Sequence, residues 1–225
     1  NTDSINFVFI SLLAIFVTMI ILMIFNKIFP TKNSSFTCVI QGGIRFNTYI
    51  FLALGGSIFG SEGLVLAAII LTFAIPFINI LCISIFALYS KNNKLDFVYL
   101  IKSIIKNPLI IGCIIGGTIN ILSIPIHVSI ENLIQILSKA ALPLGLLSIG
   151  YALVLKEITS TKKDLIISSV AKFLILPSLI FVFGKLFGLN ELMISILVLF
   201  ALLPTAPSSF ILARQLGGDV SLMTT

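Results

Sequence analysis

Seven apolar stretches, each about as long as a membrane-spanning helix, follow one another along the chain. A helix needs about 20 mostly apolar residues to cross a hydrocarbon core of about 30 Å. The chain is 58% hydrophobic and only 10% charged, whereas an average soluble domain is about 25% charged. So few charged groups cannot cover a globular surface, which disfavours a soluble domain, a disordered tail and a nucleic-acid-binding module. We expect an all-α polytopic membrane protein, a bundle of transmembrane helices.

The predicted spans are bounded by polar residues, glycine or proline. They cover about residues 5–29, 36–59, 63–89, 107–124, 133–155, 165–187 and 192–216. Gly42-Gly43 interrupts the second span, and Pro204 and Pro207 interrupt the seventh. A polar linker with a short amphipathic stretch, residues 90–106, separates the first three spans from the last four.

Basic residues gather in alternate connections, after the first, third and fifth spans. They are Lys27, Lys32, Lys91, Lys94, Lys102, Lys106, Lys156, Lys162 and Lys163. The other connections carry mainly acidic residues, with Lys185 as the exception. Because cytoplasmic loops are rich in Lys and Arg, we expect the basic connections inside and the protein in the cytoplasmic membrane, crossing it several times. The net charge of +6 then reflects topology and not a nucleic-acid partner.

The sequence repeats itself weakly with a period of five spans, as three short matches show. They pair residues 25–29 with 183–187, 49–53 with 209–213, and 60–62 with 217–219. Because five is odd, the second copy must cross the membrane in the opposite sense, which is the inverted repeat of secondary transporters. We therefore expect residues 1–89 to be the remainder of a first inverted repeat and residues 107–225 a second one. The chain would then be a piece of a ten-span protein, without its first two helices and its last.

The two interrupted spans, the second and the seventh, occupy corresponding places in the repeat. Transporters with inverted repeats bind substrate near the midplane, between broken helices whose N-terminal ends favour anions. The polar and proline residues at these breaks are therefore the candidate substrate-binding residues. They are Arg45, Asn47, Thr48, Pro204, Thr205, Ala206, Pro207, Ser208 and Ser209. A proline kink in a packing helix is the alternative interpretation.

Polar residues inside other spans add one further candidate. Lys172 lies about seven residues into the sixth span, where a charge costs about 2.5–3.5 kcal/mol unless the side chain snorkels to the interface. Arg45 has the same two interpretations. Asn79 and Asn120 are more typical of interhelical hydrogen bonds. Since no carboxylate lies deep in a span, a coupling proton or sodium ion would need Lys172, backbone, amides or the missing helices.

The sequence contains no pattern typical of an enzyme or of a cofactor site. Its three cysteines are far apart, it has one histidine, and it lacks a GxSxG motif and paired intramembrane carboxylates. His127 follows Pro125 in a connection and is interpreted as a solvated residue. We expect no metal, no cofactor and no catalytic activity.

A set of stretches spread over most of the chain matches the motifs of one known family: 45–48, 60–64, 107–110, Gly116, Asn120, 142–150, Lys172 with Pro177, 203–207 and 213–219. In these residues the sequence resembles the auxin efflux carrier family of membrane transporters, bacterial branch. The resemblance implies a ten-helix carrier of small organic anions, in which the broken fourth and ninth helices cross at the substrate site. The seven spans would be helices three to nine, with Asn47 and residues 205–209 at the crossover. Many relatives have a proline further along the fourth helix, where this chain has residues 51–56, and Gly55-Gly56 is the expected substitute.

Together these patterns and the resemblance predict a secondary active transporter that moves a small organic anion, such as a mono- or dicarboxylate, across the cell membrane by alternating access. The expected partners are this small organic anion, the lipid bilayer and a coupling proton or sodium ion, with a homodimer left open. The alternative is a membrane receptor or sensor that binds a small anion without net transport.

Overall fold

The computed structural model describes residues 2–89, 101, 105–106, 108–152 and 162–224. Among these residues every regular element is a helix, which confirms the predicted all-α class. Most of the predicted linker, and residues 153–161 at the end of the fifth span and after it, lie outside the described residues.

The first helix, α1, runs from Thr2 to Ile28 and matches the first predicted span. Asp3 lies in its first turn and Lys27 in its last. Both charges oppose the nearby end of the helix dipole and so stabilise the helix termini. The chain then turns at Pro30, which cannot continue the hydrogen-bond ladder of the helix.

The second and third predicted spans are formed by α2 (Asn33–Ile44) and α3 (Thr48–Leu88). The long α3 bends back on itself at Gly60, where φ is 68° and ψ is −154°. Only glycine adopts these angles without strain. After the bend the two arms of α3 lie side by side. Their backbones approach so closely that a Cβ added at Gly63 would lie 2.6 Å from the Gly55 carbonyl oxygen.

The next two helices are α5 (Pro108–Ile121) and α6 (Val128–Ala152). They correspond to the fourth and fifth predicted spans, although α6 begins at Val128 and not near residue 133. Its first turn contains Glu131 and is too polar to be recognised by hydropathy. An acidic residue at this place stabilises the N-terminus of a helix, so the helix extends past the apolar stretch.

One continuous helical stretch, Lys162–Leu186, forms the sixth span. It consists of α7 (Lys162–Val170), a π-helical turn at Ala171–Ile175, and α8 (Leu176–Leu186). Pro177 lacks the N–H that would continue the α-helical ladder, which explains why the ladder is interrupted here. The chain continues with α9 (Glu191–Leu202), α10 (Ser208–Leu216) and the short α11 (Val220–Thr224).

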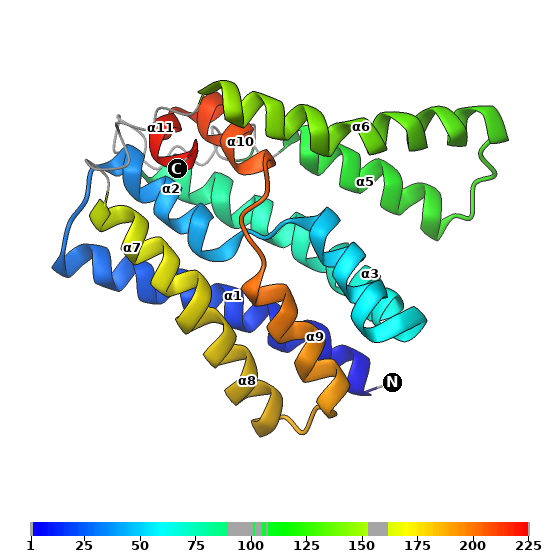
Figure 1. Cartoon of the computed structure of the whole chain (residues 1–225), viewed down its shortest axis with the longest axis horizontal. Helices are drawn as coiled ribbons and strands as arrows, with labels where there is room; N and C mark the ends of the chain where they lie inside the picture. Colours follow the sequence, from blue (N-terminus) through cyan, green and yellow to red (C-terminus); the bar gives the residue numbers. More distant parts are fainter. Residues whose placement is uncertain (1, 90–100, 102–104, 107, 153–161, 225) are drawn as a thin grey trace.

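Helices that the predicted repeat pairs with each other run in opposite directions. Figure 1 shows α1 running antiparallel to the α7–α8 stretch, and α1 packs against α8 and the π-helical turn. The ring of Phe9, near the start of α1, lies 6.0 Å from that of Phe187, just past the end of α8. Likewise α2 packs against α10 and α3 against α9, so the two broken spans cross each other.

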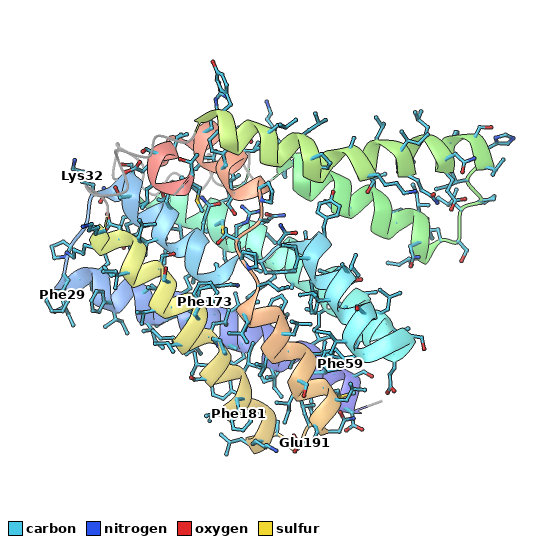
Figure 2. All side chains as sticks on the ribbon, in the orientation of Figure 1. Phe29, Lys32, Phe59, Phe173, Phe181 and Glu191 are labelled. Atoms are coloured by element: carbon cyan, nitrogen blue, oxygen red, sulfur yellow. The ribbon has the colours of Figure 1, made fainter. Side chains whose placement is uncertain are left out.

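The surface of this bundle is apolar in the manner of a membrane protein. Phe29 and Phe181 point outward in Figure 2, and each has about half of its surface exposed. Among the described residues, three helical stretches are long and apolar enough to cross a membrane: 3–28, 33–88 and 162–186. The second contains two predicted spans, whereas α9 and α10 are each too short because their span is broken.

Candidate functional site

The first break separates α2 from α3 at Arg45, Phe46 and Asn47. Arg45 has extended dihedral angles, φ −80° and ψ 153°, directly after the last helical residue of α2. The Asn47 side-chain oxygen accepts hydrogen bonds from the backbone N–H groups of Tyr49 and Ile50, at 3.1 and 3.2 Å. Asn47 is therefore the N-cap of α3 and starts a new half-helix.

The break therefore lies at neither of the two glycine pairs that the sequence suggested, so both predictions of its position were wrong. Gly42 and Gly43 lie inside α2, and Gly55 and Gly56 lie inside the first arm of α3. Gly42 serves close packing, because an added Cβ would collide with the hydroxyl of Ser168 on α7. Small residues at such interfaces let two membrane helices approach each other closely.

The second break has a similar geometry between α9 and α10. Leu203 is extended, with φ −74° and ψ 146°, and follows the last helical residue of α9. Pro207 has helical dihedral angles and directly precedes Ser208, the first residue of α10. Its missing N–H costs nothing there, since the first amides of a helix have no intrahelical partner.

The two breaks meet at the centre of the molecule, as Figure 1 shows for the extended segment between α9 and α10 and the end of α2. The Thr205 hydroxyl donates to the Gly42 carbonyl at 3.4 Å. The Phe46 ring lies 4.3 Å from that of Phe200 on α9, and Phe51 packs 5.6 Å from the same ring. These three buried rings hold the crossover together.

A cavity of about 390 Å³, here called the Arg45 cavity, lies beside this crossover. Its polar lining residues are Arg45, Thr48, Tyr49, Asn79, Ser138 and Ser208. Thr48 is the first residue of α3 and Ser208 the first of α10, so the N-terminal ends of both half-helices border the cavity. Each end contributes the partial positive charge of its helix dipole.

The guanidinium of Arg45 is held in place by two amides. It donates to the Gln41 side-chain oxygen at 2.9 Å and to that of Asn79 at 2.6 Å. Arg45 is only 5% exposed, and within the described residues no carboxylate pairs with it. The charge of Arg45 is thus held in place but not neutralised. The burial of its side chain contradicts the snorkelling interpretation. The Asn79 bond confirms the expected interhelical role of that amide.

A second cavity, of about 300 Å³, shares no lining residue with the first and is here called the Lys172 cavity. The lining residues that matter here are Cys38, Gly42, Asp164, Ser168, Lys172 and Thr205. Lys172 is 2% exposed, and its ammonium has no hydrogen-bond partner among the described residues. It therefore does not snorkel to the surface. It lies on the π-helical turn, a rare feature that often occurs at functional sites.

The predicted substrate-binding residues thus divide between two cavities. Arg45, Thr48, Ala206 and Ser208 line the Arg45 cavity. Pro204, Thr205 and Lys172 line the Lys172 cavity. The other three line neither: Asn47 caps α3, Pro207 precedes α10, and Ser209 is buried with no partner for its hydroxyl among the described residues.

Sequence reasoning missed four polar residues that belong to these cavities or their networks. Gln41 precedes Arg45 by four residues, and Asp164 and Ser168 precede Lys172 by eight and four. Helical spacing of this kind places side chains on one face and was a usable signal. Asn79 was noticed only as a polar residue, since nothing in the sequence links it to Arg45, 34 residues away. Within the described residues, no group of His, Cys, Asp or Glu could hold a metal ion.

The comparison with known families agrees with this architecture. A family model described as membrane transport protein matches residues 1–225. The chain belongs to this family. The match confirms the resemblance to the auxin efflux carriers, and it identifies an integral membrane protein of a transporter family and not of an enzyme family. None of the curated proteins is similar enough to the chain to count as a match.

Proposed function

We propose that this membrane transport protein is a secondary carrier of a small organic anion, which binds in the Arg45 cavity. The observation that carries the proposal is the buried Arg45 guanidinium, which among the described residues bonds only to neutral amide oxygens and lines the cavity that two half-helix N-termini border. A buried positive charge without a counter-charge is costly, and a bound carboxylate would relieve that cost. Guanidinium also offers the paired N–H donors that suit a carboxylate.

The shape of the cavity supports a ligand of this class. Its volume of about 390 Å³ lies within the usual range for small-molecule sites, about 300–1,000 Å³. Thr48 and Ser208 line the same space, and their hydroxyls would supply further donors, whereas the Tyr49 hydroxyl donates to the Ser138 carbonyl at 3.4 Å. Apolar lining from Leu52 and Ile75 would accommodate the carbon skeleton of the anion.

The crossover supports alternating access as the mechanism. The segment between α9 and α10 contributes Pro204 and Thr205 to the Lys172 cavity and Ala206 to the Arg45 cavity, so it lies between the two spaces. In carriers of this architecture one bundle rocks against the other around a fixed midplane site. We infer that the two cavities exchange access to the two sides of the cytoplasmic membrane.

We also propose that residues 1–89 and 107–225 belong to two inverted repeats. The 12-residue helices α2 and α9 have equal lengths and are followed by extended residues with nearly equal angles, Arg45 and Leu203. Gly60 and Gly217 both have positive φ, at 68° and 80°. These pairs are 157 or 158 residues apart, which is the offset of the sequence repeat.

The test is uptake by the full-length protein in proteoliposomes, with labelled lactate, pyruvate, malate and succinate as probes. We expect saturable uptake of at least one anion, lost in Arg45→Gln. Arg214→Gln is the matched control, because Arg214 is an exposed cation on α10 of the same broken span. Binding of an anion without uptake would favour the sensor, and uptake that survives Arg45→Gln would contradict the proposed site.

A further inference from the structure

Lys172 is a buried cation that the proposed anion site does not use. It lines the Lys172 cavity, whereas Arg45 lines the other. The ionisable residues that share its cavity are Cys38 from α2 and Asp164 from α7. Among the described residues, α1, α8, α9 and α11 contribute no ionisable group to this lining. The Lys172 ammonium makes no ion pair and no hydrogen bond with a described residue.

The position of Lys172 is one that carriers of this architecture give to a coupling cation. Gly42 lies in the last turn of α2, and Pro204 follows the end of α9, so the C-terminal ends of both half-helices border the Lys172 cavity. The C-terminal end of a helix carries partial negative charge. Half-helix C-termini and unwound carbonyls bind the sodium ion or proton in secondary transporters. Here a covalently attached ammonium lies beside those groups.

A line of polar side chains leads from Lys172 toward the end of its helix. Asp164, Ser168 and Lys172 are spaced by four residues and all line the cavity, so they lie on one face over about 12 Å. One carboxylate oxygen of Asp164 is buried without a partner among the described residues, like the ammonium. The space between them, with the Ser168 hydroxyl midway, is polar enough to hold water that bridges these groups.

We propose that Lys172 is the proton carrier that couples anion movement to a proton gradient. The inference rests on the proposed function, because it assumes that an anion is carried. Lys172 is protonated while the anion occupies the Arg45 cavity. The anion and this proton therefore cross the membrane together. When the anion leaves, Lys172 releases one proton past Ser168 and Asp164 to the aqueous solution on that side of the membrane. The empty carrier then returns with a neutral amine, and the amine takes up a proton from the other side before the next anion is carried.

The decisive variant is Lys172→Arg, in reconstituted full-length protein with the anion that wild type takes up best among lactate, pyruvate, malate and succinate. Arginine keeps the charge but does not release its proton. We expect exchange of internal for external anion to continue in Lys172→Arg, since a loaded carrier needs no deprotonation. Net uptake, which requires return of the empty carrier, should fall to the level of protein-free liposomes.

The matched control is Lys185→Arg, because Lys185 lies on the same helical stretch but is exposed and paired with Glu191. It should leave both net uptake and exchange unchanged. A merely structural role of Lys172 would reduce the two rates together, and that result would overturn the proposal. The split between exchange and net uptake is therefore the readout that distinguishes coupling from stability.

A second measurement uses wild-type protein alone and so does not depend on how the variant folds. A pH-sensitive dye inside the liposomes should report that protons enter the liposomes together with the anion. Anion uptake with no proton movement would overturn the Lys172 proposal and leave the proposed function intact. Absence of uptake for every anion in the panel would overturn the proposed function itself.

Discussion

Arg45 shows how one residue can be buried, charged and still available to a ligand. Gln41 and Asn79 fix the guanidinium through neutral oxygens, so the site keeps its positive charge. A carboxylate at either position would hold Arg45 equally well but would cancel that charge. The choice of amides is therefore what makes the cavity attractive to an anion.

This reasoning gives a test with a nearly isosteric substitution. Asn79→Asp should place a carboxylate where the amide oxygen now lies, 2.6 Å from the Arg45 guanidinium. The pair should keep the fold but raise the KM for anion uptake by roughly tenfold or more, which is about 1.4 kcal/mol of binding. Uptake kinetics in proteoliposomes measure the change. The control is Asn120→Asp, on the exposed part of α5, and an unchanged KM for Asn79→Asp would contradict this role of Arg45.

At this scale the sequence indicated two candidate charged residues, Arg45 and Lys172, but not their surroundings. A lysine or arginine a few turns into a span is compatible with burial or with snorkelling, because both depend on which way the side chain points. Arg45 and Lys172 point inward, toward cavities built partly from residues far away in the sequence. Two spacings were visible along the chain, that of Gln41 and Arg45 and that of Asp164, Ser168 and Lys172.

At the scale of elements, the break of the seventh span is the feature that proline chemistry explains best. Pro204 and Pro207 lie between α9 and α10, and a proline inside a helix costs about 3 kcal/mol relative to alanine. We expect the double variant Pro204→Ala/Pro207→Ala to join the two helices into one. That helix would fill the crossover, so uptake should be lost while the protein remains folded.

The measurement pairs anion uptake with thermal unfolding in detergent. The double variant should still unfold cooperatively, with each replaced proline lowering stability by about 0.4–1 kcal/mol, because alanine restricts the unfolded chain less than proline does. Pro30→Ala, in the exposed connection after α1, should lower stability by a similar small amount and leave uptake unchanged. Full uptake at unchanged expression in the double variant would exclude a functional role for the break.

The other break shows why element boundaries were harder to predict. No proline lies between α2 and α3, and the helix ends at Arg45-Phe46-Asn47 because tertiary contacts stabilise extended backbone there. The ring of Phe46 packs on Phe200, and the Asn47 side chain caps α3. Glycine pairs near this break suggested it lay elsewhere, but Gly42 is small to let α2 approach α7.

For the whole molecule, hydropathy predicted the order of helices well, because it averages over long stretches in which errors at single residues cancel. The repeat stays a proposal, and the antiparallel packing of α1 on α8, with Phe9 against Phe187, supports its odd period. The same geometry requires the connection after α1 and the connection before α9 to lie at opposite ends of the bundle. Figure 2 shows Lys32 and Glu191 at such opposite ends.

This separation gives a test of membrane sidedness. Basic connections stay in the cytoplasm, so Lys27 and Lys32 should lie inside and Glu191 outside. In full-length protein whose native cysteines are replaced, Glu191→Cys should react with a membrane-impermeant maleimide in intact cells. Lys32→Cys should react only after the cells are made permeable. Labelling of both in intact cells would place the two ends on one side, which an inverted repeat of five spans does not allow.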